Sequence, residues 1–191
     1  MSTPKAPPRP RLWAPWRMEY IRGPKESGCI FCRYQEEEAS RRRERLILCE
    51  RAEAFVMLNK YPFAAAHLMV VPRRHASDLG ELNEAEHGAL WELVRATASA
   101  LTVAVHAEGI NVGVNLGAAA GAGIAEHLHV HLVPRWRGDQ NFMPVIADLR
   151  VMPDHLDATW ARLEPYFRPL SDAPPESQGA PRRTVRRGPR G

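Results

Sequence analysis

The chain has 191 residues, a formal net charge of +4 and a hydrophobic content of 45%. This content is sufficient for a core, so we expect a globular chain, and the length favours one domain with appendages. No run of about 18 apolar residues is present, so no transmembrane helix is expected, and residues 1–10 lack the apolar segment of a signal peptide. We therefore expect a cytoplasmic protein with no membrane partner.

The two ends of the chain differ in composition from its middle. Residues 1–11 are predicted to form a disordered arm, and 12–168 the folded domain. The segment 169–191 is rich in Pro, Gly and Arg; within it, residues 171–191 hold five arginines against two acids, a net +3. Such a composition cannot bury enough apolar surface to fold, so a disordered basic tail is expected. A weak attraction of this tail to nucleic acid or polyanionic nucleotides is the alternative, but the near-neutral remainder argues against a nucleic-acid partner.

Five apolar segments predict β-strands, with polar turns or a helix between them. They are residues 46–49, 54–58, 67–72, 110–116 and 127–133. Pro72 and Pro134 are expected to close the third and fifth strands because proline lacks the N–H that the sheet needs. The charged segment 36–45 pairs acids with bases at helical spacing and predicts a solvated helical turn or loop.

Two helices are expected. The first begins at Asn83, an N-cap with Glu86 three residues later in the pattern of a capping box, and ends at Gly109. Its apolar face consists of Leu90, Leu93, Val94, Leu101 and Val105. The second runs from Pro153, in its first turn, to near Pro165. The fold class is therefore α+β, an antiparallel sheet with helices to one side.

Three of the eight histidines alternate with apolar residues in the last predicted strand. Since successive side chains of a strand point to opposite faces, His127, His129 and His131 are expected to share one face. A row of imidazoles on a rigid sheet suits proton transfer, metal binding or nucleophilic attack. The alternative is an exposed strand face that happens to carry histidine.

A loop rich in small residues, 115–123, precedes this strand. Small residues let backbone N–H groups approach a ligand closely, and successive N–H groups can bind an anion. The loop is therefore a candidate phosphate cradle, although it is not a P-loop and could be a flexible hairpin loop.

Two of the three cysteines, Cys29 and Cys32, form a C-x-x-C pair. Such a pair needs an explanation in a cytosolic protein, and histidines are available to complete a metal site. Cys49 lies in an apolar run and is expected to be a buried core thiol.

The histidine strand resembles the signature of the histidine triad (HIT) family of nucleotide hydrolases and transferases. Further segments resemble the branch of this family that contains bacterial diadenosine tetraphosphate phosphorylases. The segments that carry the resemblance are 127–133 for the family and 13–20, 111–117, 125–127 and 134–142 for the branch. The resemblance covers residues 12–165 and implies a HIT-like fold with five or more antiparallel strands, a long helix and a C-terminal helix. It also implies a homodimer or larger assembly.

The resemblance assigns roles to four histidines. It implies that His129 attacks the α-phosphorus of an adenine nucleotide and forms a covalent nucleotidyl-histidine. His131 would donate a hydrogen bond to the phosphate or the leaving oxygen, and His127 would orient the site. His67 would support the triad by hydrogen bonding, although a lone histidine is more often a satisfied core residue.

The resemblance also suggests nucleotide contacts. Asn59 and Asn115 match positions that touch ribose and phosphate or the leaving group, and turn-forming asparagines are the alternative. Many relatives supply Ser, Thr or Gln just before the triad, but this chain has only small or apolar side chains there, so backbone N–H groups would bind phosphate. Arg135 could contact a polyphosphate or simply be a surface arginine. The candidate contacts are Asn59, Asn115, Gly121, Ala122, Gly123 and Arg135.

Relatives with the C-x-x-C pair bind structural zinc through two cysteines and two histidines. The matching positions are Cys29, Cys32, His75 and His127, a ligand set that suits tetrahedral zinc. The alternative is a pair of reduced thiols without metal. No organic cofactor is expected.

The predicted activity is nucleotidyl transfer from an adenine nucleotide or dinucleoside polyphosphate. Phosphate as the acceptor makes the protein a diadenosine tetraphosphate phosphorylase that yields ADP and ATP, and water makes it a hydrolase. Three alternatives stay open: a nucleoside phosphoramidate or AMP-lysine hydrolase of the same family, an enzyme whose histidines hold a catalytic metal, and a nucleotide-binding or nucleic-acid adaptor without turnover.

Overall fold

The structure is a computed structural model that describes residues 28–62, 64–139 and 155–172. The predicted arm at 1–11, the 13–20 segment, Pro153 and the tail beyond 172 lie outside the described residues. Within the described ranges, none of the helices combines the length and apolar character needed to cross a bilayer.

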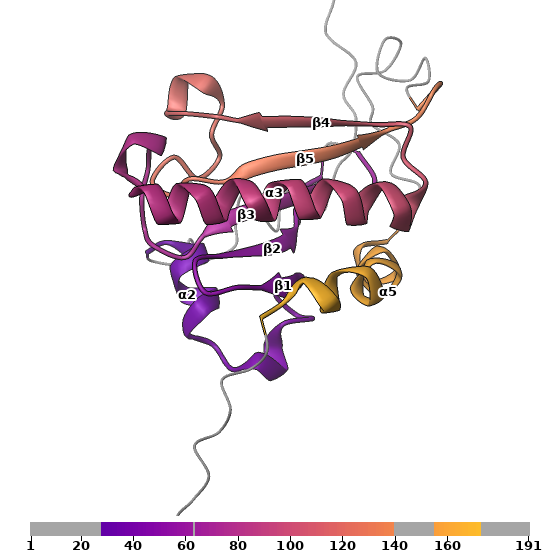
Figure 1. The fold of residues 1–191 in the computed structure, drawn as a ribbon, viewed down its shortest axis with the longest axis horizontal. Coiled ribbons are helices and arrows are strands. Elements are labelled where there is room, and N and C mark those ends of the chain that lie inside the picture. Colours follow the sequence, from indigo (N-terminus) through magenta and orange to yellow (C-terminus); the bar gives the residue numbers. More distant parts are fainter. Residues whose placement is uncertain (1–27, 63, 140–154, 173–191) are drawn as a thin grey trace, which may run out of the picture.

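The described chain forms a five-stranded antiparallel sheet (Figure 1). Its strands are β1 Ile47–Glu50, β2 Ala54–Leu58, β3 Leu68–Pro72, β4 Gly109–Val114 and β5 Val130–Arg135. They lie in the order β1-β2-β3-β5-β4, and each is antiparallel to its neighbours. The predicted α+β class and the antiparallel sheet are therefore confirmed.

Helices cover the two faces of the sheet unequally. The long helix α3 Glu84–Val105 crosses one face and packs on β2, β3 and β5, with α5 Leu156–Phe167 beside it against β1 (Figure 1). The short helix α2 Ile30–Glu36 packs on the opposite face. The remaining turns of helix are η1 Ala39–Arg41, η2 Leu79–Glu81, η3 Ala118–Ala120 and η4 Arg168–Leu170.

Alternation along the strands divides the core into two clusters. The larger cluster lies between the sheet and the helices α3 and α5, and it includes Val70, Leu93 and Leu132. The smaller cluster surrounds Phe31 of α2 on the other face, where its members are Ile47, Phe55, Met57, Met69 and Val71. Side chains of β3 and β5 that point away from α3 therefore point toward the face that carries α2.

The capping box of α3 is present as predicted. The Asn83 side chain accepts a hydrogen bond from the backbone N–H of Glu86, and the Glu86 carboxylate accepts one from the N–H of Asn83, both at 2.9 Å. The predicted end of this helix is wrong. The helix ends at Val105, and the capping residue His106 adopts a left-handed conformation with φ 51° and donates its N–H to Thr102 O, whereas Gly109 begins β4.

Other predicted boundaries also need correction. β4 ends at Val114 rather than at residue 116, and Pro134 does not close the fifth strand, since β5 continues through it to Arg135. The fifth strand begins at Val130 rather than His127, because the N–H of Leu128 bonds to Ala76 O in the loop after β3 instead of joining the ladder. The last helix continues past Pro165 to Phe167, whose buried side chain holds the final turn in the core.

The C-terminal boundary expected at 168 is also too early. Residues 169–172 belong to the folded body: Arg51 donates to Leu170 O at 2.7 Å, and the N–H of Ala52 donates to the Asp172 carboxylate at 2.7 Å. The N–H of Asp172 returns a bond to Glu50 O. These bonds fasten the end of η4 and the two residues after it to the end of β1 and the turn that follows it.

Candidate active site and metal centre

The triad lies where the chain enters β5. Leu128, Val130 and Leu132 are buried in the larger cluster beneath α3. The alternation that buries them turns the histidines toward the opposite face, so the period seen in the sequence continues through 127–129 although β5 begins at Val130. His127 is 1% exposed and His129 is 6% exposed.

One hydrogen bond determines which nitrogen of His129 carries the hydrogen. Its Nδ1 lies 2.8 Å from the backbone oxygen of His127, and a carbonyl oxygen can only accept. Nδ1 therefore carries the hydrogen and Nε2 carries the lone pair. Burial also lowers the pKa of His129 below its usual value, with a smaller opposing effect from this hydrogen bond. The imidazole is thus neutral at pH 7, with Nε2 in the nucleophilic state.

His131 and His67 form a buried pair beside His129. Their Nδ1 and Nε2 atoms, respectively, lie 3.0 Å apart. The ring centroid of His131 is 4.8 Å from that of His129. Burial lowers the pKa of His67 to about 3, helped by the charge of His131, and lowers that of His131 to about 4, helped by the charge of His129. The structure therefore brings together His67, His129 and His131 as neutral rings at pH 7.

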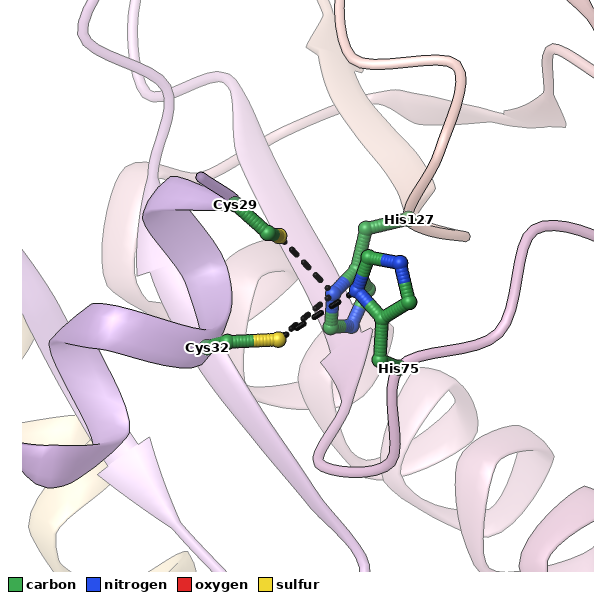
Figure 2. Close-up of side chains that lie close together, drawn as sticks. All are labelled: Cys29, Cys32, His75 and His127. Carbon is green, nitrogen blue, oxygen red and sulfur yellow. Dashed lines mark hydrogen bonds between the residues drawn. The ribbon is translucent and has the colours of Figure 1, made fainter. Parts of the chain in front are cut away.

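Four side chains gather at a second centre next to the triad, as Figure 2 shows. They come from three places: Cys29 and Cys32 from the start and first turn of α2, His75 from the loop after β3, and His127 from the approach to β5. Their ligand atoms all lie within 4.8 Å of one another. The sulfur atoms of Cys29 and Cys32 are 3.2 and 3.6 Å from His127 Nδ1, and Cys32 is 3.3 Å from His75 Nδ1.

The hydrogen bonds around this centre suit a metal ion. His127 Nε2 lies 2.9 Å from the backbone oxygen of Pro72, so Nε2 carries the hydrogen and the Nδ1 lone pair faces the two thiols. Burial, and secondly the neighbouring Cys29, raise the pKa of the Cys32 thiol to about 11, so the thiolate form calls for a nearby cation. Two sulfur and two imidazole ligands form the set that zinc prefers in structural sites.

Phe31 links the two centres, and sequence reasoning missed it. Its ring is fully buried, and the ring centroid is 5.3 Å from that of His127 and 5.4 Å from that of His129. Phe31 lies between the two cysteines in the sequence, which is the one signal that could have drawn attention to it. The helix that bears the thiols thus also bears a side chain packed on His129.

Only some of the predicted nucleotide-contact residues lie near the triad. Asn115 directly follows the last β4–β5 pair, Val114 with Val130, and so is the next position in the register opposite His129. The loop that follows is exposed over Gly121 and Gly123, with Ala122 half-buried. Gly121 has φ 87°, a left-handed conformation that favours glycine there.

Arg135 is not brought to the triad. It lies four residues past His131 on β5, roughly 13 Å along a strand. Its guanidinium makes an ion pair with Asp139 at 2.6 Å and donates to Asn111 at 3.0 Å. This side chain fastens β5 to β4 and to the turn after β5, and its contact with a polyphosphate stays a prediction.

The catalytic-metal alternative finds no support in the ranges that the structure describes. The four side chains Cys29, Cys32, His75 and His127 are the one group of three or more metal-ligating residues there. His129 and His131 do not belong to it, and His127 is its one member from the triad.

The fold and the triad define the class of protein, and comparisons with known sequences agree. The family model described as the HIT domain matches residues 41–138. The chain belongs to the HIT domain family. It is 37% identical over 165 residues to AP-4-A phosphorylase of Mycobacterium tuberculosis, a match that covers 80% of this chain and 85% of the relative.

Solved structures of histidine triad proteins have the same fold as this chain. A zinc-bound histidine triad family protein from Mycobacterium smegmatis superposes with a TM-score of 0.58 at 25% identity, covering 75% of this chain and 95% of that one. A hypothetical histidine triad nucleotide-binding protein from Sulfolobus tokodaii also has a TM-score of 0.58 at 25% identity, covering 74% and 93%.

Proposed function

We propose that this protein transfers a nucleotidyl group from an adenine dinucleotide, with diadenosine tetraphosphate as substrate and inorganic phosphate as acceptor. The observation that carries the proposal is the state of His129, a buried neutral imidazole whose Nδ1–H is bonded to the His127 carbonyl. The identity to AP-4-A phosphorylase supports the choice of substrate and acceptor.

In the first step, the Nε2 lone pair of His129 attacks the α-phosphorus. The bond from phosphorus to the bridging oxygen breaks, its electron pair stays on the departing ATP, and an N–H of His131 stabilises the developing negative charge. The His127 carbonyl holds the Nδ1 hydrogen and so stabilises the positive charge that the ring gains. Asn115 and the backbone N–H groups of residues 121–123 are the proposed contacts of the remaining phosphates.

In the second step, an oxygen of inorganic phosphate attacks the same phosphorus. The phosphorus–nitrogen bond breaks, its electron pair returns to Nε2, and ADP leaves. Water in place of phosphate would release AMP instead. Dividing one displacement into two steps lets a single imidazole serve as nucleophile and then as leaving group.

The test is a product analysis of diadenosine tetraphosphate turnover with and without phosphate. We expect ADP and ATP with phosphate, and no product from His129→Ala. The matched control is His87→Ala, which removes an exposed histidine of α3 and should leave turnover unchanged. Adenosine phosphoramidate in a parallel reaction tests the hydrolase alternative. Turnover that survives His129→Ala, or a chain that acts on no adenylated compound, would contradict the proposal.

We further propose that Cys29, Cys32, His75 and His127 hold a structural zinc ion. The sulfur and nitrogen ligands and the Pro72 carbonyl behind His127 support this proposal, as does the zinc-bound relative. A bound zinc ion would cross-link α2, the loop after β3 and the approach to β5.

Metal analysis of the purified protein tests the zinc site. One zinc per chain is expected, with loss in Cys32→Ser and retention in Cys49→Ala, since Cys49 lies in the larger core cluster. Substoichiometric zinc in the parent protein, or equal zinc in both variants, would refute the assignment.

We also propose that the protein pairs with a second copy of itself. In the described residues, β4 is an edge strand with Val112 46% exposed, and α3 exposes 59% of Val103 and 37% of Trp91. An edge strand with apolar side chains is a surface for pairing. Sedimentation should give a dimer for the parent and a monomer for Val112→Lys, and a monomeric parent would exclude the pairing.

A further inference from the structure

Asn59 lies directly across the sheet from His67, where β2 and β3 end. The last pair of the two strands is Leu58 with Leu68, and the N–H of Asn59 donates to His67 O at 2.9 Å as the next step of the ladder. Side chains opposite each other in an antiparallel pair lie on the same face. Asn59 therefore shares the face of His67 and the triad.

A turn fixes the orientation of the Asn59 amide. Its Oδ1 accepts a hydrogen bond from the N–H of Tyr61 at 2.8 Å, which identifies Nδ2 as the atom 3.4 Å from His67 Nδ1. An amide nitrogen can only donate, so His67 Nδ1 accepts. The hydrogen of the neutral His67 ring is then on Nε2.

The same direction of hydrogen-bond donation continues from His67 to His131. His67 Nε2 lies 3.0 Å from His131 Nδ1, and since Nε2 carries the hydrogen, His131 Nδ1 must accept. The one hydrogen of the neutral His131 ring is consequently on Nε2. Three hydrogen bonds thus run in a single direction, from the turn at Asn59 to the ring beside the nucleophile.

We propose that Asn59 is a positioning residue that fixes the tautomer of His131 through His67, so that His131 presents an Nε2–H to the nucleotide phosphate. This inference rests on the proposed function for the identity of the phosphate, and it gives Asn59 a role other than the expected ribose or phosphate contact. With the opposite tautomer, His131 would turn a lone pair toward the negative charge that the reaction develops.

Asn59→Asp should reverse the direction of hydrogen-bond donation between residue 59, His67 and His131 without changing the shape of the side chain. A carboxylate still accepts from Tyr61 N–H, so the turn is preserved, but its second oxygen must also accept. His67 would then carry its hydrogen on Nδ1, and His131 would have to donate from Nδ1 and lose the hydrogen at Nε2. The matched control is Asn111→Asp, the same change at an exposed residue of β4.

The primary readout is two-bond ¹H–¹⁵N correlation NMR of histidine-labelled protein at pH 8.5, which distinguishes the two neutral tautomers of each ring. We expect Nε2–H for His131 in the parent and in Asn111→Asp, Nδ1–H in Asn59→Asp, and a mixture of both in Asn59→Ala. An unchanged Nε2–H tautomer in Asn59→Asp would overturn the proposal. Because this readout needs no turnover, it stands even if the proposed reaction fails.

The kinetic readout connects the tautomer to catalysis. Removing one preorganised donor from a transition state costs about 100-fold in kcat, so Asn59→Asp should lose about that much in kcat on diadenosine tetraphosphate, with a smaller change in KM. A reversed tautomer with unchanged kcat would refute the role in positioning the donor, and an unchanged tautomer with reduced kcat would leave Asn59 as a substrate contact.

Discussion

Truncation of Phe31 tests whether α2 holds the nucleophile in place. Its ring has no exposed surface, and its centroid lies 6.4 Å from that of Phe55, 5.3 Å from that of His127 and 5.4 Å from that of His129. Replacing a buried phenylalanine by alanine removes these contacts and leaves a cavity, at a cost of about 3–5 kcal/mol. The free energy of unfolding of Phe31→Ala, measured in urea, should fall by that amount.

Phe31→Leu separates orientation from stability. Leucine retains most of the volume and should cost less than about 1.5 kcal/mol, but it lacks the ring that packs against His129. An aromatic contact is worth about 0.5–1.5 kcal/mol. If that energy orients the imidazole, its loss lowers kcat by about two- to tenfold.

The matched control is Phe167→Leu, which alters an equally buried ring on the other side of the sheet. It should lower the free energy of unfolding by a similar amount and leave kcat unchanged. The reasoning is refuted if the two leucine variants have the same kcat, or if Phe31→Ala costs less than about 1 kcal/mol.

Three further predictions follow from the geometry. In the folded chain the pKa of His67 is lowered to about 3 and that of His131 to about 4, from the ordinary value of 6.5. The unfolded chain therefore binds protons first as the pH falls through 6.5. The contribution of these two residues to the free energy of unfolding is at its maximum above pH 6.5 and decreases below it, toward a slope of about 1.4 kcal/mol per pH unit for each histidine. Urea unfolding between pH 7.5 and 4.5 should show this decrease, with a smaller slope in His67→Gln, and a flat profile would contradict it. Gly113 pairs with His131, and apart from its chain neighbours no described atom lies within 4 Å of an added Cβ. Gly113→Val should therefore fold normally but raise KM, because the valine side chain would crowd the proposed phosphate site. An unchanged KM would refute the placement of the phosphate beside His131. Asn83→Ala should lose about 1 kcal/mol of stability with kcat intact, and unchanged stability would exclude an energetic role for the capping box.

Features with local causes could be predicted from the sequence. β2 has the predicted bounds because an apolar run of strand-forming residues lies between polar turns. The start of α3 was predictable because Asn83 and Glu86 form their capping bonds within one turn. The proximity of Cys29, Cys32, His75 and His127 was predictable only through the family resemblance, since they come from separate elements.

Features with distant causes could not be predicted. A helix of seven residues is too short to be stable alone, so α2 depends on the burial of Phe31 against the sheet. Its one buried residue also gives no hydrophobic periodicity that could be recognised in the sequence. The delayed start of β5 depends on Ala76 O, the partner of the Leu128 N–H, in a distant loop. The ion pair of Arg135 with Asp139 did have a signal, the spacing of four residues, but that spacing does not exclude a phosphate ligand. The role of Asn59 depends on the direction of hydrogen bonds, which a sequence does not encode locally.

The measurement that tests the central claim most directly is the identification of a covalent intermediate. The protein is mixed with diadenosine tetraphosphate in the absence of phosphate, quenched in alkaline denaturant to preserve a phosphorus–nitrogen bond, and analysed by peptide fragmentation mass spectrometry. We expect one AMP group per chain, located on His129 and discharged as ADP when phosphate is added before the quench. AMP on His127, on His131 or on a residue outside the triad, or turnover with no covalent species, would contradict the assignment of His129 as the nucleophile.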